Sequence, residues 1–312
     1  MNAGDSTRIG QDIPSRVRLA VLGSPISHSR SPRLHRACYS LLGRIDLQYS
    51  AIDVSAGQLL GFWAALDANW LGLSLTMPLK TTVLPLLAAL DGYAARTAAV
   101  NTVLFTDQGP VGFNTDVVGF LEVLKAMVPR FESDRVDHRE HARALVLGAG
   151  ATASSALCAL AELGCADVTV AARRAESVAD LAQRFAELDI TAVQLPGQGG
   201  VDPRTSGAWN RLGAVDVVIN TLPVDAASPQ LLNIVRDLAA HNAGTFIDAL
   251  YEPSPPPLLD AWRRGGGSGT DGLALLREQG LAQVLIFTGE TVDSATLTSL
   301  RACTDAAVNS PA

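Results

Sequence analysis

The chain has 312 residues, 48% of them hydrophobic and 18% charged, which supplies a large core and suits two domains. The formal net charge of −7 argues against a nucleic-acid partner, because such proteins present basic side chains to the phosphates. No apolar run approaches the length that crosses a bilayer, so no membrane partner is expected. Residues 1–16 lack the apolar stretch of a signal peptide and are predicted to be a flexible leader.

The cysteines show no pattern of a metal or redox site. Cys38, Cys158, Cys165 and Cys303 form no C-x-x-C pair, and no histidine stands at metal-ligand spacing. Three of them lie in helical patterns among Ala and Leu, where a free thiol behaves as a small apolar residue. We therefore expect free, mostly buried thiols, no metal and a reducing, cytoplasmic location.

The first half of the chain predicts strands that alternate with helices. The predicted strands cover residues 17–22, 47–54 and 71–77, and two more, joined at a Gln-Gly turn, lie within residues 100–116. After the first strand comes "GSPISHSRSPRLH", in which Ser31 is the expected N-cap of a helix and Pro32 its first residue. Asp116 is the expected N-cap of a helix over residues 117–128.

The second half has a more regular pattern. The charged stretch 130–141 is predicted to be a loop or a domain linker, and the glycine-rich stretch 263–272 a flexible loop. Between them, helical patterns separate predicted strands over residues 142–147, 167–174, 214–223 and 245–251. Strands that alternate with helices predict a parallel sheet with right-handed crossovers.

A glycine turn in this half is typical of dinucleotide binding. "LVLGAGATA" places Gly148, Gly150 and Ala153 between a strand and a helix, so that the turn residues and Ala151 can approach a pyrophosphate at the helix N-terminus. The next strand ends in Arg173 and Arg174 where an acid would select NAD, and their guanidinium groups favour the 2′-phosphate of NADP. The alternatives are an ordinary tight turn and two solvated arginines.

Several motifs together resemble the shikimate dehydrogenase family, from about residue 17 to about residue 290. "GSPISHSRSPRLH" is similar to its G-x-P-I-x-H-S-x-S-P-x-x-H motif, "LSLTMPLK" to N-V-T-x-P-x-K and "AAVNTV" to A-x-N-T-L. "GFNTDVVGF", "DALYEPSPPPLL" and "DGLALLREQGLAQ" also resemble family motifs. Two motifs depart from the family, because Ser74 replaces an Asn and Ala172-Arg173-Arg174 replaces Asn-Arg-Thr.

The resemblance implies roles for the matched residues. Lys80 matches the catalytic lysine and Asp116 its carboxylate partner. The implied substrate contacts are Ser27 and Ser29, which would bind a carboxylate, and Thr76, Asn101, Tyr251 and Gln279. Each alone has a plain structural alternative, such as a turn hydroxyl, a cap or a packed tyrosine. His28 and His35 are expected to be structural, because both flank a loop–helix junction.

These observations lead to a two-domain α/β enzyme. Residues 17–122 and helices from about 275 to 312 are expected to form a substrate-binding domain with a mixed sheet, and residues 123–274 a Rossmann domain that binds NADP. The active site would lie in the cleft between them. The implied reaction is the NADPH-dependent reduction of 3-dehydroshikimate to shikimate, by a monomer or homodimer. The alternatives are an NAD-preferring quinate/shikimate dehydrogenase and a non-catalytic sensor of pathway metabolites.

Overall fold

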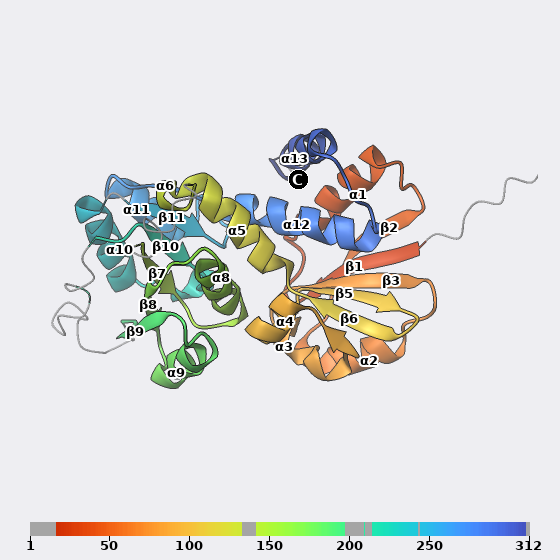
Figure 1. Ribbon diagram of the computed structural model, residues 1–312, viewed down its shortest axis with the longest axis horizontal. Coiled ribbons are helices and arrows are strands. Elements are labelled where there is room, and N and C mark those ends of the chain that lie inside the picture. The colour runs from red at the N-terminus through yellow and green to blue at the C-terminus, as the bar shows by residue number, and fades with distance from the viewer. Residues whose placement is uncertain (1–16, 133–141, 197–208, 210–213, 243, 310–312) are drawn as a thin grey trace, which may run out of the picture.

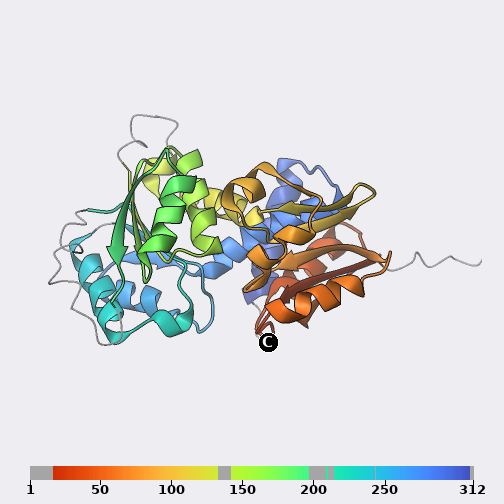
Figure 2. The same ribbon diagram turned by 90° about the horizontal axis from the view of Figure 1, so that it is seen from below.

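The computed structural model describes residues 17–132, 142–196, 209, 214–242 and 244–309. In this part, the chain folds into two lobes, each with a six-stranded sheet (Figures 1 and 2). One sheet is mixed and the other parallel, which confirms the predicted fold class. The predicted leader, 1–16, lies outside the described residues, as does most of the predicted linker.

The first lobe holds the mixed sheet, with strand order β2-β1-β3-β5-β6-β4. β1, β2 and β3 are parallel, whereas β5 runs antiparallel to both β3 and β6. The strands are β1 (Val17–Gly23), β2 (Leu47–Asp53), β3 (Trp70–Leu75), β4 (Ala89–Leu90), β5 (Thr102–Thr106) and β6 (Gly109–Phe113). The helices of this lobe are α1 (Ser31–Leu41), α2 (Leu59–Ala64), α3 (Leu79–Thr82) and α4 (Gly92–Thr97).

The second lobe holds the parallel sheet, with strand order β12-β11-β10-β7-β8-β9. Counted from β7, this is the 3-2-1-4-5-6 order of the Rossmann fold, in which the order reverses between β7 and β10. The strands are β7 (Arg143–Leu147), β8 (Asp167–Ala172), β9 (Asp189–Gln194), β10 (Val217–Asn220), β11 (Thr245–Asp248) and β12 (Ser268–Thr270). The helices are α8 (Ala151–Glu162), α9 (Ala175–Arg184), α10 (Pro229–His241) and α11 (Pro257–Arg264).

The prediction of a flexible loop over residues 263–272 was wrong in part, because β12 lies within it. The glycines of this stretch let the chain approach closely: a Cβ at Gly269 would lie 2.3 Å from the carbonyl oxygen of Phe246 in β11. The indole of Trp262 also donates a hydrogen bond of 2.9 Å to the carbonyl of Ser268. Pairing with β11 therefore orders a segment whose composition is typical of a loop.

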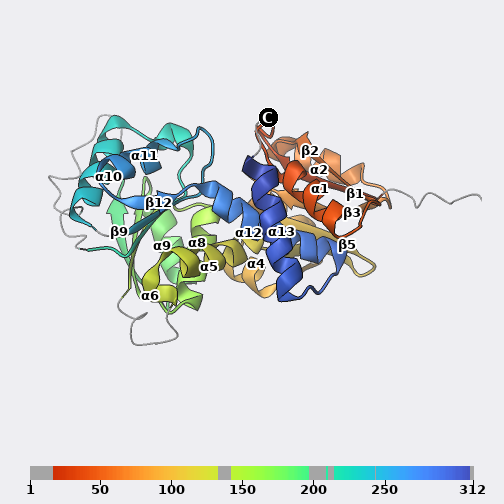
Figure 3. The ribbon, with the colours of Figure 1, turned by 90° about the horizontal axis from the view of Figure 1, so that it is seen from above.

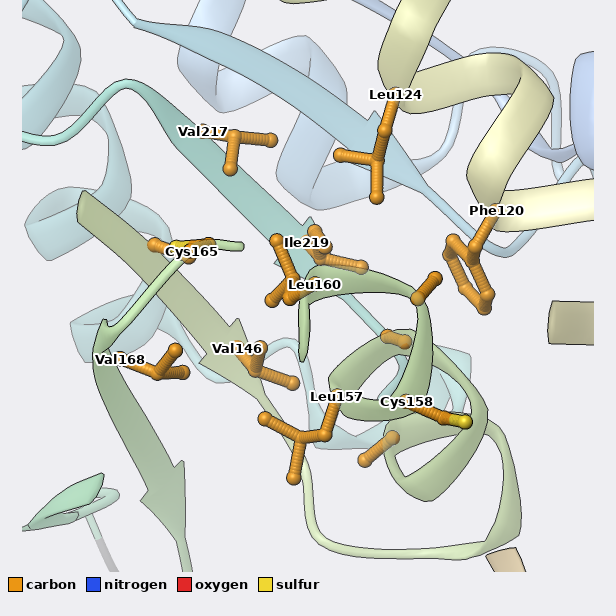
Figure 4. Close-up of a cluster of buried hydrophobic side chains, with 14 of the residues drawn as sticks. Phe120, Leu124, Val146, Leu157, Cys158, Leu160, Cys165, Val168, Val217 and Ile219 are labelled. Atoms are coloured by element: carbon orange, nitrogen blue, oxygen red, sulfur yellow. The ribbon is translucent and has the colours of Figure 1, made fainter. Parts of the chain in front are cut away.

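A buried apolar cluster holds α8 on the parallel sheet (Figure 4). Leu157 and Leu160 of α8 are fully buried with Val146 of β7 and Ile219 of β10. The four cysteines are free, and Cys38, Cys158 and Cys165 are buried. Burial raises the pKa of the Cys158 thiol to about 11, so it stays a neutral thiol that packs as an apolar group.

Four further helices lie outside these two groups. They are α5 (Thr115–Met127), α6 (Pro129–Glu132), α12 (Gly272–Thr288) and α13 (Ser294–Asn309). Two of them, α5 and α12, connect the lobes (Figure 1). α5 and α12 pack on each other across the middle of the molecule, and α13 lies against α1 (Figures 1 and 3). The predicted boundary between residues 122 and 123 falls inside α5, and the exact division into domains stays a prediction.

Two helix starts differ from the expected ones. α1 begins one residue early, so Arg30 is its N-cap and Ser31 is already helical, with Pro32 in the first turn. α5 is capped by Asn114, whose side chain accepts a hydrogen bond from the amide of Asp116. The Asp116 carboxylate is thereby left to contact other groups.

No helix in the described ranges is both long and apolar enough to cross a membrane.

The close contact between β3, β5 and α12 gives a test of this packing. A Cβ at Gly72 would lie 2.5 Å from the carbonyl oxygen of Val103 and 2.5 Å from the ring of Phe287. We expect Gly72→Ala to lower the free energy of unfolding by about 1–3 kcal/mol in urea denaturation. The control is Gly57→Ala, where no atom lies within 4 Å of the new Cβ, and a change within about 1 kcal/mol is expected. Equal stabilities of the two variants would contradict the packing.

Candidate active site

A cleft of about 490 Å³ lies between the two lobes. Its first wall is the segment that follows β3, with Thr76, Met77, Pro78, Lys80 and Thr81. Its second wall is formed by the turns after β7, β8 and β10, at the carboxyl edge of the parallel sheet where the strand order reverses. Ligands of open α/β sheets bind at this position.

Lys80 and Asp116 form an ion pair at the edge of the cleft. The Lys80 Nζ donates to Asp116 Oδ2 at 2.5 Å, and the side chains are 15% and 7% exposed. Lys80 belongs to α3, where the buried Leu79 anchors the helix, and Asp116 lies in the first turn of α5. The sequence motifs that contain these two residues therefore meet in space, as the resemblance implies.

Asn101 holds the second oxygen of this carboxylate. Its Nδ2 donates to Asp116 Oδ1 at 2.9 Å, and also lies 3.3 Å from Gln279 Oε1. Asn101 is 1% exposed and follows the end of α4, directly before β5. The amide of Leu75 donates to its carbonyl at 2.7 Å, which ties Asn101 to the end of β3.

The tight crossing of α5 and α12 brings Gln279 to this group. A Cβ at Gly119 of α5 would lie 2.9 Å from a methyl group of Leu275 and 3.2 Å from the amide nitrogen of Gln279. Glycine therefore allows the two helix axes to approach. As a result, Lys80, Asp116, Asn101 and Gln279 form one connected cluster from four separate motifs.

Thr76 and the serine-rich stretch lie beside each other. The amide of Thr76 donates to the carbonyl of Leu22, and a Cβ at Gly23 would lie 2.3 Å from the Thr76 methyl group. Ser27 is exposed in the loop after β1, and Ser29 is half-buried with its hydroxyl 3.4 Å from the amide of Ser31. Both serines are absent from the lining of the 490 Å³ cleft, whereas Thr76 and Lys80 belong to it.

Tyr251 reaches the same stretch from the other lobe. The guanidinium of Arg30 lies over its ring at 5.6 Å and pairs with Glu252 at 2.5 Å. Burial raises the pKa of the Tyr251 phenol, while a hydrogen bond from the Arg30 backbone opposes this shift. Arg30 thus links the serine-rich stretch to the second lobe, a contact that sequence motifs alone did not indicate.

The glycine turn has the space that a dinucleotide needs. Gly148 has φ of 110°, and a Cβ there would lie 2.4 Å from the Thr221 hydroxyl, so only glycine fits. At Gly150 the space for a Cβ is open, and Ala151 begins α8 beside it in the cleft. Ala153 is fully buried in the core instead, which is its expected packing role.

Arg173 and Arg174 also line this cleft and are exposed after β8. Ser177, from the first turn of α9, lines the cleft beside them. Two guanidinium groups, a hydroxyl and a helix N-terminus form a donor set that suits a phosphate dianion. The residues present therefore fit NADP.

The histidine of α1 is structural, as expected. His35 is fully buried, stacks on Tyr49 with ring centroids 3.8 Å apart, and hydrogen-bonds to Tyr39 and Gln283. Burial lowers its pKa to about 3, against a smaller opposing effect of the hydrogen bond to Gln283. It therefore stays neutral at ordinary pH, and it does not line the cleft.

Two residues near the site were missed by the motif comparison. Thr152, in the first turn of α8, places its hydroxyl 3.4 Å from Lys80 Nζ across the cleft. Gln283 lies one helical turn after Gln279 and is 2% exposed, with hydrogen bonds to four neighbouring residues. The spacing of four residues between two glutamines on one helix was the available signal. No cluster of metal ligands exists among the residues that the structure describes.

The fold and the cleft place the chain among the two-lobed dinucleotide-binding α/β dehydrogenases. Residues 21–103 match the family model of the shikimate dehydrogenase substrate binding domain, and residues 131–198 that of shikimate / quinate 5-dehydrogenase. The shikimate dehydrogenase (NADP(+)) of Moorella thermoacetica is 33% identical over 273 residues, which cover 87% of this chain and 88% of the relative. The chain belongs to the shikimate dehydrogenase family.

Solved structures agree with this assignment. The shikimate dehydrogenase of Mycobacterium tuberculosis is 32% identical, with a TM-score of 0.73, and the match covers 92% of this chain and 99% of that one. The Thermus thermophilus enzyme, solved in complex with NADP(H) and shikimate, is 28% identical with a TM-score of 0.67 over 93% and 99% of the two chains. The predicted family is therefore confirmed.

The burial of His35 predicts a pH dependence of stability. The folded chain holds this group neutral down to about pH 3, whereas an unfolded histidine binds a proton below about pH 6.5. As the pH is lowered from 6 to 4, this residue should therefore reduce the free energy of unfolding by up to about 1.4 kcal/mol for each pH unit. His35→Asn should flatten the urea-unfolding profile over this range. The exposed His241→Asn is the control, and a His35→Asn profile parallel to that of wild type would contradict the assignment.

Proposed function

We propose that the chain is an NADP-dependent shikimate dehydrogenase that interconverts 3-dehydroshikimate and shikimate in the cleft between its lobes. The supporting observation is the Lys80–Asp116 pair, which faces the glycine turn across the cleft. The Moorella thermoacetica relative is a shikimate dehydrogenase (NADP(+)), and the solved Thermus thermophilus structure holds NADP(H) and shikimate.

Oxidation of the alcohol removes a hydride from carbon and a proton from oxygen. NADP, when bound, supplies the hydride acceptor, and in the reverse direction NADPH supplies the hydride. Lys80 is the acid/base at the alcohol oxygen: its amine takes the proton on oxidation and returns it on reduction. Asp116 orients Lys80 through the 2.5 Å contact and keeps its ammonium near the cleft. Thr152 lies within reach of the same ammonium.

The remaining matched residues orient the substrate. Ser27 and Ser29 bind its carboxylate with their hydroxyls, since both lie in the loop that follows Gly23, and Gly23 packs closely against Thr76. Asn101 and Gln279 contact the ring hydroxyls from the buried side of the site. Tyr251 contacts the substrate from the side of the second lobe. Several weak polar contacts to one small ring fix its orientation toward Lys80.

Arg173 and Arg174 bind the 2′-phosphate of NADP, and Gly148, Gly150 and Ala151 accommodate the pyrophosphate at the start of α8. Arg174 is the N-cap residue of α9, and both Arg174 and Ser177 of the first helical turn line the cleft. The first turn of α9 also contains Glu176, which weakens the positive potential there.

An activity matrix tests the proposed function. The purified chain is offered shikimate or quinate with NADP or NAD, and the nicotinamide absorbance is followed. We expect kcat/KM for shikimate with NADP to exceed the other three combinations. A preference for quinate with NAD would support the catabolic alternative and overturn the proposed cofactor contacts. No turnover in any combination would contradict the proposed enzyme and favour a metabolite sensor.

The two arginines give a prediction on cofactor choice. Arg173→Ser and Arg174→Ser should each weaken NADP binding by about tenfold or more, because a hydrogen bond to a charged group contributes about 1.5–3 kcal/mol. The dissociation constants are measured by calorimetry for NADP and for NAD. NAD binding should change little, and so should both cofactors with the exposed control Arg236→Ser on α10. An equal loss for NADP and NAD would contradict a 2′-phosphate contact.

A further inference from the structure

A continuous chain of buried hydrogen bonds runs from β2 to the Asp116 carboxylate. The phenol of Tyr49 donates to Ser74 at 2.6 Å, and Ser74 donates to Gln283 Oε1 at 2.9 Å. Gln283 Nε2 donates to the Thr102 hydroxyl at 2.9 Å, and this hydroxyl donates to Asn101 Oδ1 at 2.8 Å. Asn101 Nδ2 then donates to Asp116 Oδ1 at 2.9 Å. We refer to these six residues as the relay.

Backbone groups fix the direction of the relay. The amide N–H of Thr115 donates to Asn101 Oδ1 at 2.9 Å, so the Nδ2 of this side chain must face Asp116. The carbonyl of Asn101 accepts from Gln283 Nε2 at 3.2 Å, so the Oε1 of Gln283 must face Ser74. Because an amide nitrogen only donates, the Thr102 hydroxyl accepts from Gln283 and has its hydrogen free for Asn101.

The direction of the hydrogen bonds in the relay also fixes the tautomer of His35. Gln283 Oε1 is an acceptor, so His35 carries its proton on Nε2, 3.2 Å away, and accepts from Tyr39 on Nδ1, 3.0 Å away. The groups that pack around Gln283 are thus all satisfied. Every relay residue is buried, so no water can readily replace a lost partner.

Gln283 is the residue on which the relay depends. It joins α12 to β3, to β5 and to α1, through Ser74, Thr102, the Asn101 carbonyl and His35. Ser74 stands where the family motif has Asn, and Gln283 places a carboxamide within hydrogen-bond distance of that serine. The chain therefore keeps an amide at this point, supplied by a different element.

We propose that Gln283 is a positioning residue of the reaction, which fixes the Asn101 amide through Thr102 and the Asp116 carboxylate through Asn101. This proposal rests on the proposed function, in which Asp116 orients Lys80. Without the Thr102 hydroxyl, Asn101 Oδ1 loses the hydrogen bond that Thr102 donates. Without Gln283, the Thr102 hydroxyl loses its own donor, so the geometry of its hydrogen bond to Asn101 is no longer fixed. The carboxylate then has a wider range of orientations, and a misplacement of about 1 Å near the reacting group can lower turnover about 100-fold.

The test compares Gln283→Met, Thr102→Val and the double variant, with shikimate and NADP as substrates. Each single variant should lower kcat by about 10- to 100-fold, while the dissociation constant for NADP, measured by calorimetry, stays within about twofold of wild type. The double variant should lose no more than the larger single loss, because both changes interrupt one chain. Thr102→Ser keeps the hydroxyl and should retain wild-type kcat.

Thr304→Val is the control for a buried hydroxyl outside the relay. Thr304 is fully buried in α13, where its hydroxyl donates to the carbonyl of Leu300 and hydrogen-bonds with the thiol of Cys38 in α1, so it has no part in the relay and kcat should not change. Losses that multiply in the double variant, a wild-type kcat in Thr102→Val, or a parallel loss of NADP binding would overturn the proposal. Thr102→Val alone carries the test if Gln283→Met does not fold, since valine is close to threonine in shape.

A failure of the proposed function can be distinguished from a failure of the relay by the activity of the wild-type chain. A wild-type chain that does not oxidise shikimate would contradict the proposed function itself. An active wild type with unaffected variants would contradict the relay alone.

Discussion

The contact between Lys80 and Asp116 is the constraint on which the site depends. Two opposite charges that are only 15% and 7% exposed lose hydration, and such a pair is stable only when its remaining hydrogen-bonding groups find partners. The second oxygen of Asp116 is held by Asn101, and Asn101 in turn by Thr102 and Thr115. The buried polar groups of the first lobe therefore support one ion pair at the surface of the cleft.

The two lobes make different contributions to this arrangement. The first lobe provides the ion pair and the polar groups around it, through the antiparallel pairing of β3 with β5 and the crossing of α5 with α12. The second lobe provides the glycine turn, which needs only backbone amides and a helix N-terminus to hold a phosphate. Both lobes need glycine where two segments approach closely. Gly119 lets α5 approach α12, and Gly148 lets the glycine turn approach Thr221.

The sequence predicted the fold class and the members of the site cluster, because motifs preserve residue types at fixed spacing. Lys80, Asn101, Asp116 and Gln279 were all named from such motifs, and the structure places them in one connected group. Contacts between distant segments were not predictable in this way: Arg30 with Glu252, Thr152 with Lys80, and Gln283 with Ser74 join residues from different elements. The helix caps at Arg30 and Asn114 lie one and two residues before the expected ones, a shift of the size that helix ends commonly show.

The most direct measurement is the turnover of Lys80→Met with shikimate and NADP, together with its calorimetric dissociation constant for shikimate. Methionine keeps the length of the side chain but cannot transfer a proton, so kcat should fall by about 10²- to 10⁴-fold, with a much smaller change in shikimate binding. Lys125→Met, at an exposed lysine of α5, is the matched control and should retain wild-type kcat. A near-normal kcat in Lys80→Met would contradict the assignment of Lys80 as the acid/base.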